Sequence, residues 1–151
     1  MTTSTLKPEV RDTLRAMLLA SLGTTMYQRL YVRDGKKKRD VMKKGELSCA
    51  FYVSSMLAMF GFMDKAHATV KTTETMLKKF GWKKTKTFTF GNVLIWDFTP
   101  DSDGHQHIGI YLGHQKAISN SSKKRVPTMH HYTYQGKRPV IRMYKNKKLE
   151  K

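Results

Sequence analysis

The chain has 151 residues, the usual length of one domain and enough to bury a single hydrophobic core. With 39% hydrophobic and 11% aromatic residues, it is too rich in core-forming side chains to be wholly disordered. A formal charge of +18 predicts attraction to polyanions: nucleic acid, an anionic membrane surface or an anionic cell-wall polymer. The single cysteine excludes an internal disulfide and a cysteine-rich zinc site.

The N-terminal segment predicts an amphipathic helix that enters through Pro8, a residue suited to a first turn. Charged residues interrupt its apolar run, which distinguishes it from a signal peptide. No stretch approaches the ~20 apolar residues that a membrane span needs. We therefore expect no transmembrane segment, and a protein that is cytoplasmic or exported without a recognisable signal peptide. The apolar face of this helix is formed by Val10, Leu14, Met17, Leu18 and Leu22.

Two helices and a basic arm are predicted next. Residues 31–46 carry much positive charge and have turn chemistry at Asp34-Gly35, so they predict an exposed arm or a short hairpin. Residues 49–60 predict a core helix, with Ser48 as its N-cap. A further helix should be capped by Thr72 or Thr73 and should end near residue 81.

The second half of the chain changes to strand periodicity. Strands are predicted in residues 85–98, 107–113, 115–122 and 138–144. Helices followed by antiparallel strands indicate an α+β fold, with N-terminal helices packed on a small antiparallel sheet. We expect one domain over 1–144, with the first helix and basic arm in 1–44, and a basic flexible tail over 145–151.

Cys49 opens a predicted helix, where unpaired N–H groups and the helix dipole stabilise a thiolate and lower the thiol pKa. A buried cysteine that only fills the core is the competing interpretation. A nucleophilic cysteine needs a base, and His107 opens a predicted strand. Ile108 and Ile110 would anchor that strand, while Gly109, on the same face as His107, leaves space beside the imidazole.

Three segments in this order, "SCAFYVSSML" (48–57), "GNVLIWDF" (91–98) and "HIGIYLGHQKAISNSS" (107–122), resemble the NlpC/P60 group of papain-like cysteine peptidases, of which the CHAP amidases are near relatives. The resemblance covers about half the chain. It implies a papain-like fold, Cys49 as the nucleophile and His107 as the general base.

The family's third residue lies twelve positions after the base, which falls on Ser119. We expect its neighbour Asn120 to orient the imidazole instead, because an amide oxygen accepts the imidazole N–H well, with Ser119 as the substitute. Neighbouring strand residues face opposite sides, so only one of the two fits. His130 or His131 could also orient His107 or line the groove. The residues expected to bind substrate are Ser48, Trp96, His105 and Ser119.

The resemblance implies amide hydrolysis without a cofactor, most simply by a peptidoglycan endopeptidase or amidase. Anionic wall polymers would suit the charge. Two alternatives stay open: a basic nucleic-acid-binding module, with Tyr31, Tyr132 and Tyr134 as exposed stacking residues, and a catalytically inactive papain-like binding domain. The histidines at 105, 107, 130 and 131 make a metal site conceivable, but no carboxylate cluster accompanies them, and we expect none.

Overall fold

The computed structural model describes residues 5–102 and 104–150 of the chain. Within them the helices are α1 (Val10–Ala20), α2 (Cys49–Ala58), α3 (Val70–Lys79) and the short 3-10 helix η1 (Lys147–Leu149). The strands are β1 (Tyr31–Asp34), β2 (Lys37–Asp40), β3 (Lys83–Lys84), β4 (Val93–Trp96), β5 (His107–Gly113), β6 (Lys116–Asn120), β7 (Pro127–His131) and β8 (Val140–Lys145). No helix in these ranges is long and apolar enough to cross a membrane.

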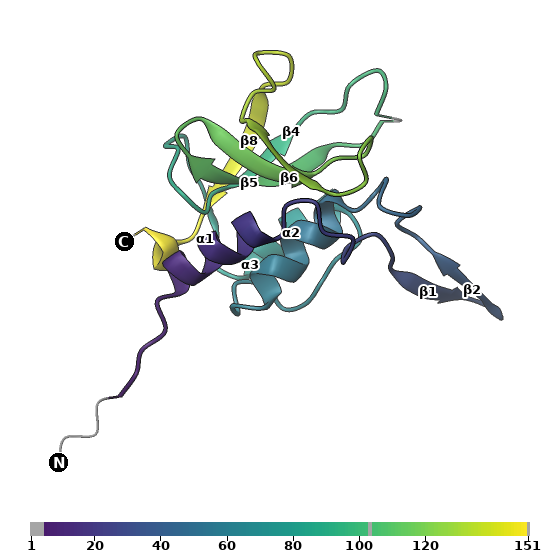
Figure 1. Cartoon of the computed structure of the whole chain (residues 1–151), viewed down its shortest axis with the longest axis horizontal. Coiled ribbons are helices and arrows are strands. Elements are labelled where there is room, and N and C mark those ends of the chain that lie inside the picture. Colours follow the sequence, from purple (N-terminus) through teal and green to yellow (C-terminus); the bar gives the residue numbers. More distant parts are fainter. Residues whose placement is uncertain (1–4, 103, 151) are drawn as a thin grey trace.

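The strands form two antiparallel sheets. β1 and β2 make a two-stranded ribbon, and the other six strands pair in the order β3-β8-β4-β5-β6-β7. The α-helices lie on one side of the larger sheet (Figure 1). The α+β class expected from the sequence is therefore confirmed.

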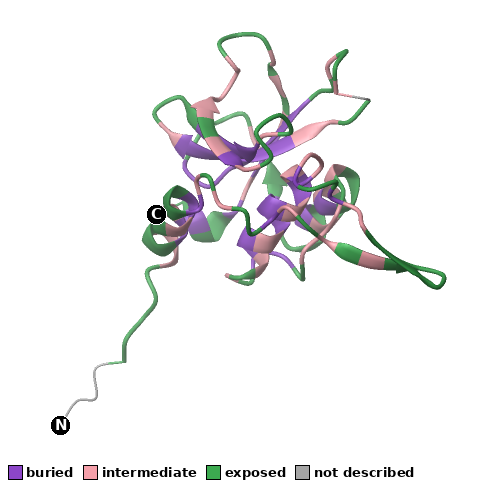
Figure 2. Cartoon of the chain, turned by 45° about the vertical axis from the view of Figure 1, so that its right-hand side comes forward, coloured by how far each residue is buried: buried purple, intermediate pink, exposed green. Residues whose placement is uncertain are grey.

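The main hydrophobic core fills the space between the helices and the larger sheet, where the buried segments of both face each other (Figure 2). β5 contributes Ile108, Ile110 and Leu112 to this core, while Tyr111 joins a smaller cluster on the opposite face of the sheet. The alternation predicted for this strand is confirmed. The smaller cluster consists of Leu94, Trp96, Tyr111, Ala117 and Met143, with Tyr132, Tyr134 and Val140 packed against it.

The helix ends differ from the predicted caps. Ser48 occupies the N-cap position of α2, but its side chain makes no capping bond, and its buried hydroxyl has no partner among the described residues. α3 is capped by Thr69, whose hydroxyl accepts a hydrogen bond from the Thr72 backbone N–H at 3.1 Å. The caps expected at Thr72 and Thr73 are wrong, because both residues already lie inside the first turns of α3.

Three other expectations need correction. Of residues 85–98, only 93–96 form a strand, and neither β3 nor β7 was anticipated. The flexible tail expected from residue 145 is wrong for residues 145–150. Lys145 ends β8, and Leu149 is buried in the main core against Gly91. The apolar contact of one leucine fixes a segment whose other residues are mostly charged.

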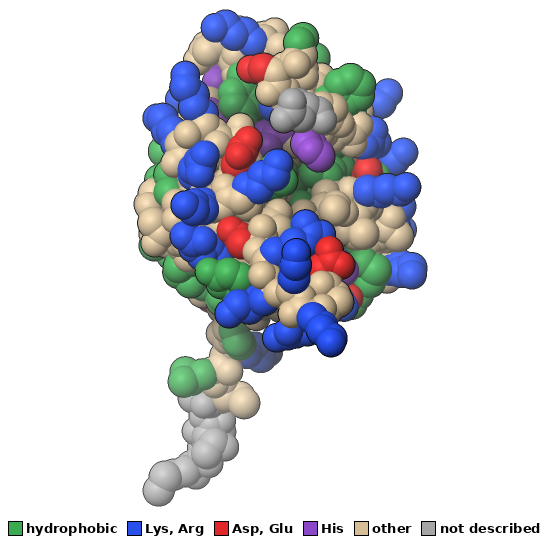
Figure 3. Space-filling model, turned by 90° about the vertical axis from the view of Figure 1, so that its right-hand side faces the viewer, with side chains coloured by type: hydrophobic (Ala, Val, Ile, Leu, Met, Phe, Trp, Pro, Cys, Tyr) green, Lys and Arg blue, Asp and Glu red, His purple; other side chains and the backbone are tan. Residues whose placement is uncertain are grey.

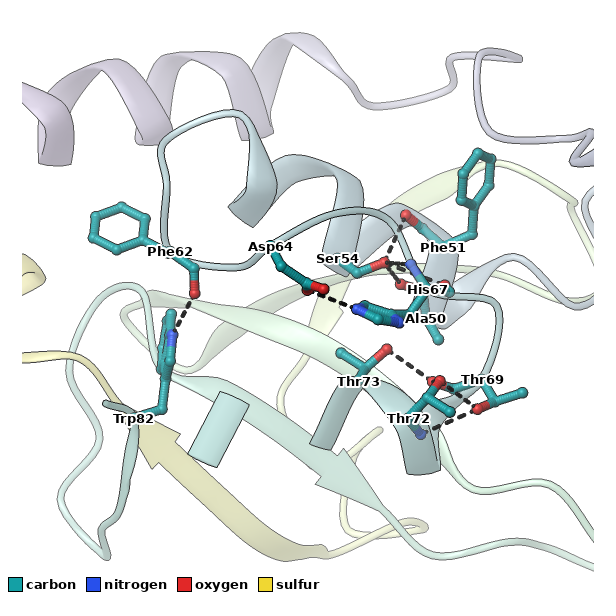
Figure 4. A network of polar contacts seen from close by, with 10 residues as sticks. All are labelled: Ala50, Phe51, Ser54, Phe62, Asp64, His67, Thr69, Thr72, Thr73 and Trp82. Carbon is teal, nitrogen blue, oxygen red and sulfur yellow. Dashed lines mark hydrogen bonds and ion pairs between the residues drawn. The ribbon is translucent and has the colours of Figure 1, made fainter. Parts of the chain in front are cut away.

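The segment between α2 and α3 is tied to α2 by a polar network (Figure 4). The Ser54 hydroxyl accepts a hydrogen bond from the His67 backbone N–H at 2.7 Å and donates to the Ala50 carbonyl at 2.7 Å. The His67 imidazole pairs with Asp64 at 2.8 Å. These contacts fix the backbone just before Ala68, where the chain forms one wall of the cavity described below.

The segment 29–44, here called the basic hairpin, contains β1 and β2 and projects away from the body of the molecule (Figure 1). It carries eight Lys or Arg residues and two Asp residues. Asp40 fixes its base, since its carboxylate accepts backbone hydrogen bonds from Leu30, Met42 and Lys44 at 2.9–3.0 Å. The exposed arm or hairpin predicted from the sequence is confirmed.

Candidate active site

Cys49 is the first residue of α2, where backbone N–H groups lack intrahelical partners. The backbone N–H groups of Ile108 and Ala50 lie close enough to the thiol to lower its pKa. The thiol therefore lies where the start of α2 meets the start of β5. Donors in this position favour negative charge on the sulfur or on an atom bonded to it.

His107 is the first residue of β5 and pairs across the sheet with Trp96 of β4. The two ring centroids are 5.3 Å apart. The Nε2 atom of His107 lies 2.9 Å from the Ser119 hydroxyl oxygen on β6, whereas Nδ1 makes no hydrogen bond to a side chain in the described ranges. The imidazole is thus held through one nitrogen, and the other is available to take a proton.

The close approach of these groups requires glycine at position 109. A Cβ atom there would lie 2.6 Å from the Ile118 carbonyl oxygen and 2.9 Å from both Ser119 Cβ and Trp96 Cη2. The open space that the sequence predicted beside the His107 ring is not there, because Trp96 and Ser119 fill the place that Gly109 leaves.

Ser119 connects His107 to further polar side chains. Its hydroxyl oxygen lies 2.7 Å from His130 Nε2 and 3.1 Å from the Tyr134 hydroxyl. The rings of His130 and Tyr134 are stacked with centroids 4.0 Å apart. Of the two histidines that the sequence left open, His130 reaches His107 through Ser119, while the His131 imidazole bonds Thr133 instead.

The expectation that Asn120 orients His107 is wrong. Its side-chain N–H donates to the Gly45 carbonyl at 2.8 Å, on the face of β6 opposite Ser119. Strand alternation explains the difference: Ser119 points to the side of the sheet that carries the His107 ring, and Asn120 points to the helix side. Asn120 still lines the cavity, and its buried carbonyl oxygen has no partner among the described residues.

The cavity has a volume of about 630 Å³ and contains both Cys49 and His107 in its lining. Its walls come from the base of the basic hairpin, the first turns of α2 and α3, the loop before β5, and Arg138. Figure 3 shows the side of the molecule on which this cavity opens: a hollow with histidine visible in it and basic side chains around it. A groove of this size accommodates a short peptide segment or a similar chain.

The residues expected to bind substrate divide into two groups. His105 is exposed in the loop before β5 and lines the cavity, as predicted for a residue at the groove mouth. Ser48, Trp96 and Ser119 are buried, and none of them is in the cavity lining, so they do not contact a ligand held there. Trp96 and Ser119 instead support His107 from behind.

The protonation states of the pair follow from burial. Burial raises the pKa of the Cys49 thiol, and the backbone N–H groups of Ile108 and Ala50 and the charge of Arg138 offset part of that effect. Burial, with the charges of Arg138 and His130, lowers the pKa of His107 to about 3. The lowered thiol pKa expected from the helix start is therefore wrong, because desolvation outweighs the backbone N–H groups and the Arg138 charge that favour the thiolate. At neutral pH the pair is a thiol and a neutral imidazole.

An ion-pair network fixes the loop that leads into β5. Arg142 on β8 bonds both carboxylate oxygens of Glu74 on α3, at 2.5 and 3.0 Å, and also bonds Gln106 at 2.9 Å. The Tyr144 hydroxyl donates to the same carboxylate at 2.5 Å. Because Gln106 precedes His107, this network holds the backbone next to His107. No pattern in the sequence paired Glu74 with Arg142.

Within the described residues, no group of three His, Cys, Asp or Glu side chains is placed to hold a metal ion. Arg138 also lines the cavity and was not singled out from the sequence, since nothing in its local pattern sets it apart from other basic residues.

No protein-family model matches this chain, and no curated protein matches it. Inference about its activity therefore depends on the site geometry and on the three motif segments.

Proposed function

We propose that this protein is a cysteine-dependent amide hydrolase with a papain-like domain of the NlpC/P60 type, acting on peptidoglycan peptides as an endopeptidase or amidase. The observation that carries the proposal is that Cys49, at a helix start, and His107, at a strand start, line one cavity. The hydrogen bond between His107 Nε2 and the Ser119 hydroxyl gives the base a fixed orientation.

The reaction begins when the Cys49 thiol gives its proton to His107 Nδ1 while the sulfur attacks the amide carbonyl carbon. The carbonyl oxygen becomes an oxyanion, and the backbone N–H group of Cys49 supplies part of the oxyanion hole that stabilises it. The imidazolium returns the proton to the leaving nitrogen, the C–N bond breaks, and a thioester remains. Water, activated by the neutral imidazole, attacks the thioester and releases the carboxylic acid and the thiol.

The two pKa shifts oppose separate proton transfer from the thiol to the imidazole, so the base has to work by coupled transfer. With a pKa of about 3, His107 is neutral at pH 7 but is a weak base, so it takes the thiol proton only as the carbon–sulfur bond forms. The raised pKa of Cys49 means that little thiolate exists without that transfer. Removing His107 should therefore remove most of the reactivity of the thiol near neutral pH.

The substrate class follows from the resemblance and from the charge around the cavity. NlpC/P60-like domains cleave cell-wall peptides, and the net charge of +18 favours a substrate embedded in an anionic polymer. The basic hairpin contributes Val32 and Val41 to the cavity wall. A polymer that binds the hairpin would therefore lie beside the thiol.

The basic hairpin also favours a second candidate function, nucleic-acid binding, because an exposed basic β-ribbon fits a nucleic-acid groove. The aromatic contribution expected for that function is reduced. Tyr31 is exposed, but Tyr132 and Tyr134 are half-buried against the smaller cluster. Steeply salt-dependent binding to DNA or RNA together with an inert thiol would support this function over hydrolysis.

The test is digestion of purified peptidoglycan fragments, with new amino groups and product masses as the readout. Wild-type protein should release peptides, and Cys49→Ala should release none while unfolding at a similar temperature. No release by either protein, with wild-type binding to the same fragments, would indicate a catalytically inactive binding domain.

A further inference from the structure

The hydrogen bonds around Ser119 fix a proton arrangement that starts at a backbone carbonyl. His130 Nδ1 lies 2.8 Å from the His131 carbonyl oxygen. A carbonyl oxygen only accepts, so Nδ1 must carry the proton. A neutral imidazole has one N–H, and His130 Nε2 is then an acceptor. Burial lowers the pKa of His130, which favours this neutral form.

Ser119 then has one arrangement that satisfies all its partners. Its single proton is donated to His130 Nε2 at 2.7 Å. Its two lone pairs accept from His107 Nε2 at 2.9 Å and from the Tyr134 hydroxyl at 3.1 Å. Burial raises the pKa of Tyr134, so its hydroxyl keeps the proton that it donates.

The consequence for His107 is that its proton lies on Nε2 and its lone pair lies on Nδ1. We propose that His130 is a positioning residue which, through Ser119, holds His107 in the tautomer that accepts a proton at Nδ1. The catalytic use of this His107 tautomer rests on the proposed hydrolase function. The assignment of the two histidine tautomers does not depend on that function.

The arrangement also accounts for a serine where the family has its third residue. A serine hydroxyl alone can rotate and either donate to His107 or accept from it. Donation would place the His107 proton on Nδ1 and disable the base. With His130 taking the hydroxyl proton, only acceptance remains. When His107 becomes an imidazolium, its Nε2–H still donates to Ser119, and no proton moves further along the chain.

The first test uses the wild-type protein and needs no activity. Long-range ¹H–¹⁵N NMR of uniformly labelled protein at pH 7 distinguishes the two neutral tautomers of each histidine, with assignments from His107→Gln and His130→Gln. We expect opposite tautomers, Nδ1–H for His130 and Nε2–H for His107. Any other combination overturns the proposal.

The second test compares two matched variants. His130→Asn keeps an N–H near the former Nδ1 but has no group at the position of Nε2, whereas His130→Gln places an amide oxygen there to accept from Ser119. The Cys49 alkylation rate at pH 7 should fall about tenfold in the asparagine variant and recover most of the wild-type value in the glutamine variant. Equal rates in the two variants would contradict the role of His130. Opposite tautomers with no peptide release would instead leave the arrangement standing and refute the hydrolase function.

Discussion

Replacing Gly109 by alanine should both destabilise the protein and loosen the hold of Ser119 on His107. The added Cβ would lie 2.6 Å from the Ile118 carbonyl oxygen and 2.9 Å from Trp96 and Ser119, all closer than the 3.0 Å that Cβ contacts essentially never fall below. Trp96 is completely buried, so it has no room to move away. Overpacking costs about 1–3 kcal/mol, and contact with backbone places this site at about 3. For a domain of this size that lowers Tm by about 6–12 °C.

The assay is urea unfolding together with the rate of Cys49 alkylation by iodoacetamide in the folded state. Gly35→Ala is the control, because it lies at the hairpin tip with a positive φ of 61° and open space around it. It should cost about 1–2 kcal/mol from backbone strain alone and leave alkylation unchanged. If Gly109→Ala were as stable as wild type and alkylated at the wild-type rate, the packing account of His107 would be wrong.

Three further outcomes are expected. Glu74→Gln should cost about 2 kcal/mol at pH 7 by urea unfolding. Burial would raise the pKa of Glu74, but hydrogen bonds from Arg142 and Tyr144 outweigh it and lower the pKa. The ionised Glu74 carboxylate therefore stabilises the folded protein above the ordinary glutamate pKa, and this stabilisation is lost as the pH falls through the lowered pKa of Glu74 in the folded state. If the loss of unfolding free energy in Glu74→Gln stayed constant from pH 7 to pH 2, this account would be contradicted. Ser48→Ala should be neutral or stabilising by thermal unfolding, because the buried hydroxyl has no partner among the described residues; a loss of about 1 kcal/mol would show that it caps α2. Changing the three lysines at 36–38 of the basic hairpin to glutamate should weaken binding to an anionic polymer, measured by titration at two salt concentrations, and equal salt slopes for both proteins would exclude the hairpin from the contact.

Cys49 and His107 could be found from the sequence because each stands at the start of a regular element. Cys49 opens an apolar helix and His107 opens an alternating strand, and such local patterns are readable without tertiary information. The alternation along β5 also predicted which residues join each face of the sheet.

The supporting residues could not be found in this way. The choice between Ser119 and Asn120 depends on which face of β6 turns toward His107, and that register is set by pairing with β5. β7 has a short, partly polar sequence with a leading proline, so its residues do not show a clear strand pattern. The position of His130, which lies on this strand, therefore could not be predicted. The basic composition of residues 145–151 predicted a flexible tail. Leu149 is buried by a long-range contact, which composition alone does not reveal.

The most direct test of the proposed Cys49–His107 pair is the rate of iodoacetamide alkylation across pH 5–10, on folded wild-type protein and on His107→Ala. The account predicts that the wild type reacts faster near pH 7, because His107 accepts the thiol proton. The two rates should converge as the pH approaches the raised pKa of Cys49, where thiolate forms without a base. A thiol that reacts only after unfolding, or with the same rate in both proteins at every pH, would contradict the catalytic role of this pair.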